Sequence, residues 1–145
     1  MKRNEKYQDT TTFTFFNANP KNRFTTDCVI RAICAATTTP YNQVVMDLAT
    51  IQCETGYDDG EPRVYGKYLE RLGWTKRPQP RKADGSKYTG AEFCRKVARS
   101  GTTYVAHLGG HHIVAIVDKK VLDTWDCTTK CIGNYWVKEN TMTTT

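Results

Sequence analysis

The hydrophobic pattern of this chain changes near residue 102, and this change constrains the fold more than any other feature of the sequence. Before residue 102, apolar residues recur at helical spacing. After it, short runs of β-branched and aromatic residues follow one another with turns between them. Helices followed by strands are typical of an α+β arrangement, here with the strands paired as an antiparallel meander. We therefore predict an α+β fold with the helical half first, and a single domain over residues 1–145.

Capping and turn residues define the ends of the predicted elements. Pro40 and Thr89 are typical of helix starts, and Gly73 and Gly101 are typical of helix ends. We predict helices over 28–37, 40–54, 61–73 and 89–101, and strands over 11–16, 103–108, 112–117, 120–124 and 135–138. The polar, Thr-rich residues 1–12 are expected to form a loose arm.

Composition indicates a globular protein with reduced cysteines. The chain has 145 residues, 39% of them hydrophobic, which is enough to bury a core without disulfide bonds. No signal-peptide apolar segment follows Met1, and no apolar run reaches the about 18 residues of a membrane span. We therefore expect neither secretion nor membrane insertion, but a cytoplasmic protein. Its six cysteines are interpreted as free thiols, although an even number also fits a disulfide framework.

The net charge of +6 raises the question of an anionic partner. Most basic residues are scattered, which argues against nucleic acid, but one cluster lies in the Pro- and Gly-rich segment "KRPQPRKADGSK". Its members are Lys76, Arg77, Arg81, Lys82 and Lys87. A solvated loop is one interpretation, and a docking patch for an acidic partner is the other.

Cys28 is the candidate nucleophile. Asp27, or one of the two threonines before it, is a candidate N-cap, which places Cys28 in the first turn of the predicted helix. There the helix dipole favours the thiolate, and the free N–H groups of that turn can bind the oxyanion that forms when sulfur attacks a carbonyl. The alternative is that Cys28 is a small buried hydrophobic residue, as most free cysteines are.

His112 is the candidate base. It begins a predicted strand and shares parity with Val114 and Ile116, so it is expected on the same face. His107 and His111 are interpreted as structural or surface residues.

Asp123 is the candidate that orients His112, because the two residues lie across one predicted hairpin. Asp118 belongs to the tight turn of that hairpin. Asp126 points to the opposite face from Asp123 if the strand continues. A cysteine at a helix start, a histidine at a strand start and an aspartate on the next strand then form the nucleophile, base and orienting group of a thiol hydrolase.

These residues resemble the papain-like cysteine peptidases, in particular the compact C39-like branch of bacteria and phages. The resemblance rests on Cys28 in "TTDCVIRA", His112 in "HHIVAIV" and Asp123 in "DTWD", with "GNYWVK" similar to a following strand. By the same resemblance, Asn22 in "KNRFTTDC" takes the place of the oxyanion-hole amide. Short phage proteins with "DCVIRA" and "DTWD" segments also look similar, which implies a viral gene product acting in the host cytoplasm.

The resemblance implies a hydrolase that attacks an amide, ester or isopeptide bond and forms a thioester, with no metal or cofactor. A peptide or protein substrate, with an acidic one as an open alternative, is expected, and nucleic acid and membranes are not. If an amine replaced water, the same residues would form an acyl transferase.

Two other classes remain as alternatives. A metal-binding module is suggested by Cys127 and Cys131, four residues apart, together with His107, His111 and His112. The C-x2-C spacing of zinc knuckles and a matching second pair are missing, which argues against it. The other alternative is a non-catalytic phage interaction or inhibitor protein on the papain-like fold.

Overall fold

A computed structural model describes residues 8–138, and its centre is one six-stranded mixed sheet. The strands lie in the order β1-β5-β4-β3-β6-β2, and every pair is antiparallel except β1–β5, which is parallel. Their bounds are β1 Phe13–Phe15, β2 Thr75–Arg77, β3 Thr103–Leu108, β4 His112–Val117, β5 Lys120–Asp123 and β6 Ile132–Val137. The α+β class and the β3-β4-β5 meander are confirmed, whereas the parallel β1–β5 pair was not expected.

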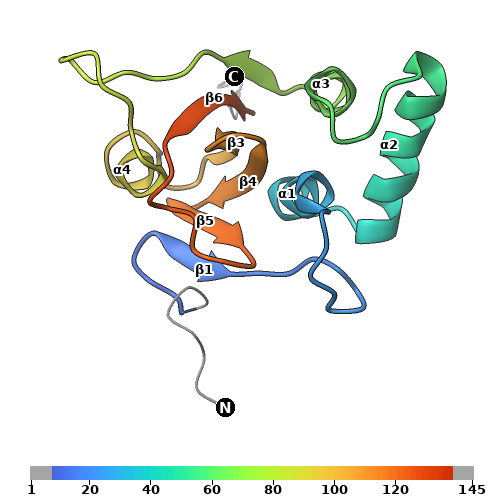
Figure 1. Ribbon diagram of the computed structural model, residues 1–145, viewed down its shortest axis with the longest axis horizontal. Helices are drawn as coiled ribbons and strands as arrows, with labels where there is room; N and C mark the ends of the chain where they lie inside the picture. Colours follow the sequence, from blue (N-terminus) through green and yellow to red (C-terminus); the bar gives the residue numbers. More distant parts are fainter. Residues whose placement is uncertain (1–7, 139–145) are drawn as a thin grey trace, which may run out of the picture.

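Helices cover both faces of the sheet. The helices are α1 Cys28–Thr37, α2 Tyr41–Thr55, α3 Pro62–Arg71 and α4 Gly90–Lys96. Helices α1, α2 and α3 lie on one side and α4 lies on the other (Figure 1). Each face has its own hydrophobic core: Ile113 and Trp136 pack with α1 to α3, and Val114 and Ile116 pack with Phe93 of α4. Among residues 8–138, no helix is both long and apolar enough to cross a bilayer.

Several boundaries differ from the sequence prediction. Helix α4 begins with the predicted Thr89 cap but ends at Lys96, not at Gly101. It ends early because the Ala98 N–H bonds back to the Phe93 carbonyl, and the Arg99 N–H donates to the Tyr104 hydroxyl. Strand β6 begins three residues before the predicted start, and β2 lies where the sequence predicted a loop.

The end of the predicted loose arm, residues 1–12, is bonded to strands β1 and β5. Residues 1–7 lie outside the described part, but the Thr12 carbonyl accepts a hydrogen bond from the Val121 N–H of β5. The Asp9 carboxylate accepts from the Phe15 N–H. Because β1 pairs with β5, the residues just before it are tied to the edge of the sheet.

The β4–β5 hairpin brings the two candidate residues of the C-terminal half together. Asp118 and Lys119 have φ angles of 50° and 66°, and two successive positive φ values are typical of a tight type I′ hairpin turn. Asp118 therefore has the turn role predicted for it. The hairpin pairs Ala115 with Leu122, so the start of β4 and the end of β5 lie at the same end of the sheet.

Candidate active site

The first turn of α1 presents Cys28 to the start of β4. Cys28 is the first residue of α1, is half-buried and packs at the edge of the core between α1 and the sheet. Its sulfur lies close to the His112 imidazole and the Ile113 backbone, and both lower the pKa of the thiol. Burial raises the pKa of the Cys28 thiol, but these contacts and the positive charges of His112 and Arg31 outweigh burial and lower its pKa below the usual range.

His112 lies between Cys28 and Asp123. Its Nε2 is 2.5 Å from Asp123 Oδ2, so Nδ1 is the ring nitrogen left for the sulfur. The ring also lies beside that of Trp125, with centroids 5.3 Å apart. Burial lowers the pKa of His112, but the carboxylate and the sulfur outweigh burial and raise its pKa to about 9. A lowered thiol pKa and a raised imidazole pKa favour a thiolate–imidazolium pair at neutral pH.

The face of the sheet predicted for His112 was wrong. Strand parity predicted that its side chain lies on the face of Val114 and Ile116, which pack with α4. The imidazole instead lies near Cys28 of α1, which covers the other face. Because His112 is the first residue of β4, its side chain lies at the end of the sheet and is not confined to either face.

Asp123 is the most buried member of the predicted triad, with 1% of its surface exposed. Its Oδ2 contacts His112 and accepts from the Cys127 thiol, 3.3 Å away. Its Oδ1 accepts from Arg31 Nη1 at 2.6 Å and from the Thr124 N–H at 2.7 Å. Burial raises the pKa of Asp123, but its bonds to His112, Arg31 and Thr124 lower that pKa below the usual range, so the carboxylate is ionised.

Arg31 connects this carboxylate to a second one. It lies one turn after Cys28 in α1, is 7% exposed and bonds through Nε to Asp27 Oδ1 at 2.7 Å. Asp27 Oδ2 in turn accepts from the Tyr41 hydroxyl and the Asn19 amide. Asp27 does occupy the N-cap position, but its side chain makes no capping bond because Arg31, Tyr41 and Asn19 use both of its oxygens.

Sequence reasoning missed Arg31. The signal was present, since an arginine in the apolar segment "CVIRAICAAT" must be paired if it is buried. An aspartate four residues earlier in the sequence offered that pairing.

A cavity of about 500 Å³ lies over the sulfur. The residues that line it are Thr25, Thr26, Cys28, Val29, Arg31, Gly60, His111, His112, Thr124 and Trp125. His111 is exposed there, while the Asp123 contact belongs to His112. Cys28 and His112 therefore border an accessible cavity.

Asn22, the residue predicted for an oxyanion hole, is not among the residues that line this cavity. It is exposed in a turn, with a φ of 55°, and its N–H bonds to the Asn19 carbonyl. Two hydroxyl residues, Thr25 and Thr26, line the cavity instead. The Cys28 N–H has no backbone partner within residues 8–138, so it remains a donor for an oxyanion.

The arrangement does not favour the metal-binding alternative. Cys127 is buried and Cys131 is exposed, and the metal-competent group among the described residues contains only the first of them, with His112 and Asp123. Burial and the Asp123 carboxylate raise the pKa of the Cys127 thiol well above its usual range, whereas metal binding requires a thiolate. The Arg31 guanidinium next to Asp123 also repels a cation.

Comparison with known proteins identified no relative of this chain. No protein-family model, curated protein or solved structure matches the chain. Of the residues predicted from the sequence, Cys28, His112 and Asp123 lie together in the structure, whereas Asn22 does not join them.

Proposed function

We propose that this protein is a thiol hydrolase of papain-like architecture, a cysteine peptidase, amidase or isopeptidase. The observation that carries the proposal is the position of the His112 imidazole, which bonds to the buried Asp123 carboxylate and interacts with the Cys28 thiol. These groups come from the start of a helix and from two neighbouring strands, which is the order of elements that the papain-like resemblance implies.

The first chemical step is attack by the Cys28 thiolate on a carbonyl carbon. A C–S bond forms, the carbonyl π electrons move to oxygen, and the Cys28 N–H donates to the resulting oxyanion. When the tetrahedral intermediate collapses, the bond to the leaving amine or alkoxide breaks. The leaving group takes a proton from His112, and a thioester remains.

The second step returns the enzyme to its starting state. His112 accepts a proton from water as the water oxygen attacks the thioester carbon. Collapse breaks the C–S bond and releases a carboxylic acid and the Cys28 thiolate. Asp123 stays ionised throughout and holds the imidazole in place. Attack by an amine in place of water would give acyl transfer with the same residues.

The cavity supports a peptide or protein segment as the substrate. Its volume of about 500 Å³ accommodates several side chains, and Val29 and Trp125 give it apolar walls beside polar threonines. A reducing compartment keeps a free thiol such as Cys28 reduced, so the proposal includes the cytoplasm, that of the host if the protein is encoded by a phage.

Active-site titration tests the proposal against a non-catalytic interaction protein. Mixing the protein with p-nitrophenyl acetate is expected to give a burst of nitrophenolate followed by steady turnover, with acetyl on Cys28 detected by mass spectrometry. Cys28→Ala should abolish both phases. Cys53→Ala, which removes an exposed cysteine of α2, is the matched control and should leave them unchanged. Acetylation of Cys28 no faster than that of Cys53 would support the non-catalytic alternative.

A further inference from the structure

The net positive charge of the protein belongs to one segment, residues 76–99. Of the 21 lysines and arginines, eight lie in this segment, which leaves 13 elsewhere. Of the 15 aspartates and glutamates, two lie in it, which also leaves 13. The rest of the chain is therefore neutral overall, and the net charge of +6 is that of residues 76–99.

Most of these cations face solvent. Lys82 is the half-buried exception, and it bonds to Glu92 of α4 at 2.5 Å. The seven exposed ones are Lys76, Arg77, Arg81, Lys87, Arg95, Lys96 and Arg99. Because two carboxylates stand against eight cations in this segment, it produces a positive potential at the surface. Such a potential attracts anionic partners.

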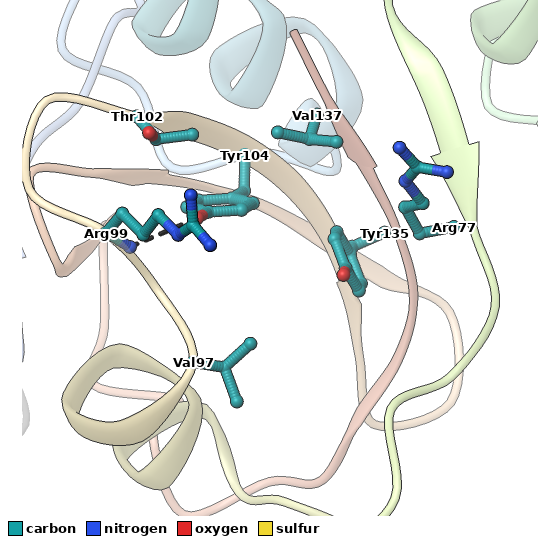
Figure 2. Close-up of a pocket in the computed structure, with 7 residues that line it drawn as sticks. All are labelled: Arg77, Val97, Arg99, Thr102, Tyr104, Tyr135 and Val137. Atoms are coloured by element: carbon teal, nitrogen blue, oxygen red, sulfur yellow. Dashed lines mark hydrogen bonds between the residues drawn. The ribbon is translucent and has the colours of Figure 1, made fainter. Parts of the chain in front are cut away.

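A cavity of about 440 Å³ lies against this segment. Figure 2 shows Arg99 beside Tyr104 at one end of the cavity, and Tyr135 and Arg77 at the other. The Tyr104 hydroxyl accepts from the Arg99 backbone N–H, so its own proton is available to a ligand. The Thr102 side chain lines the same space. The cavity thus combines guanidinium groups with hydroxyl donors.

This cavity is separate from the one over Cys28. Tyr104 and Val137 line it and belong to the core on the α4 face of the sheet, whereas Cys28 packs with the core on the other face. The two cavities share no lining residue. A partner bound beside Arg99 would therefore leave the proposed active site open.

The chemistry of the surface favours carboxylates over nucleic acid. Guanidinium forks bind carboxylates and phosphates, but single-stranded nucleic acid also requires exposed aromatic rings on which bases stack. Tyr104 is 5% exposed, and none of the exposed large hydrophobic residues within residues 8–138 lies in the segment. We propose that residues 76–99 and the adjoining cavity bind an acidic peptide segment of a partner protein, with its carboxylates at Arg99.

Fluorescence anisotropy with labelled peptides tests this proposal. Oligoglutamate is expected to bind and oligoglutamine of the same length is not, and added salt should weaken the binding because the charges are exposed. Arg99→Glu should weaken oligoglutamate binding by about tenfold or more, since it replaces an attraction with a repulsion. The backbone N–H that bonds to Tyr104 is retained in this variant.

Lys21→Glu is the control, because Lys21 is exposed in the loop before α1 and lies outside the segment. It makes the same change in net charge and should leave binding within about twofold of the parent, since exposed charges at a distance are screened. Equal weakening by both variants, or no weakening by Arg99→Glu, would overturn the proposal. Tighter binding of an oligothymidylate than of oligoglutamate would assign the surface to nucleic acid instead.

Discussion

Replacing Asp123 by asparagine is the substitution that most directly probes the site. The change keeps the shape of the side chain and an oxygen for His112, but all four groups around the carboxylate are hydrogen-bond donors. They are Arg31 Nη1, the Thr124 N–H, His112 Nε2 and the Cys127 thiol. An amide has one oxygen and one NH₂ group, so its NH₂ must face either the guanidinium or the imidazole and thiol.

The expected cost has two parts. Arg31 is 7% exposed and would lose one of its two carboxylates, and disrupting a buried ion pair costs about 3–5 kcal/mol of the free energy of unfolding. His112 would lose the carboxylate that raises its pKa to about 9, so burial would bring that pKa down. The Cys28 thiolate would lose its imidazolium partner, and alkylation of Cys28 at neutral pH should slow by about tenfold or more.

Urea unfolding and iodoacetamide kinetics measure the two parts separately. Asp126→Asn is the matched control, because Asp126 Oδ1 accepts both bonds from Thr128 and an amide oxygen can replace it. The control should unfold and react like the parent protein. If Asp123→Asn lost less than about 1 kcal/mol of stability and kept the parent alkylation rate, Asp123 would be neither the anchor of Arg31 nor the group that charges His112.

Three further predictions concern reactivity. Iodoacetamide at neutral pH should label Cys28 faster than the exposed Cys53 and Cys131, and mass mapping that finds either of these labelled first would contradict the lowered pKa of Cys28. His112→Ala should lower turnover of an activated ester by roughly 10²- to 10⁴-fold, while His111→Ala, at the exposed neighbour, should change it little; the reverse result would reassign the base. Hydrolysis of an amide substrate should fall as the pH rises through about 9, because His112 loses the proton that it gives to the leaving amine, whereas alkylation of the Cys28 thiolate should persist; parallel losses would contradict this assignment.

Local sequence signals predicted the elements that carry the site. Helical periodicity after Asp27 predicted a helix that starts at Cys28, and the structure begins α1 there. Alternation from His112 and a turn at Asp118 predicted the hairpin, and two positive φ angles make that turn. Because a hairpin is a local structure, the approach of Asp123 to His112 could also be inferred from the sequence.

Long-range pairing could not be read in the same way. Strand β1 is three residues long, and its parallel partner β5 begins at Lys120, more than 100 residues later, so no local signal specifies the register. The position of Asn22 relative to Cys28 depends on a turn in which Asn22 itself has a positive φ, and Asn22 does not line the cavity. Counting residues back from Cys28 could not reveal that turn.

Arg31 connects the helix that begins with Cys28 to the carboxylate that contacts His112. It lies on the same helix as Cys28, and its bond to Asp123 joins that helix to the end of β5, where the carboxylate also holds His112. His112 first and Arg31 after it lower the pKa of Asp123, so the residue that joins the helix to the strand also helps to keep this carboxylate ionised. Asp27 completes the balance, because one guanidinium lies between two carboxylates and the protonated imidazole supplies the second positive charge. If the Cys28 thiol is ionised, these five groups carry three negative and two positive charges, so the two cations together hold all three anions in place.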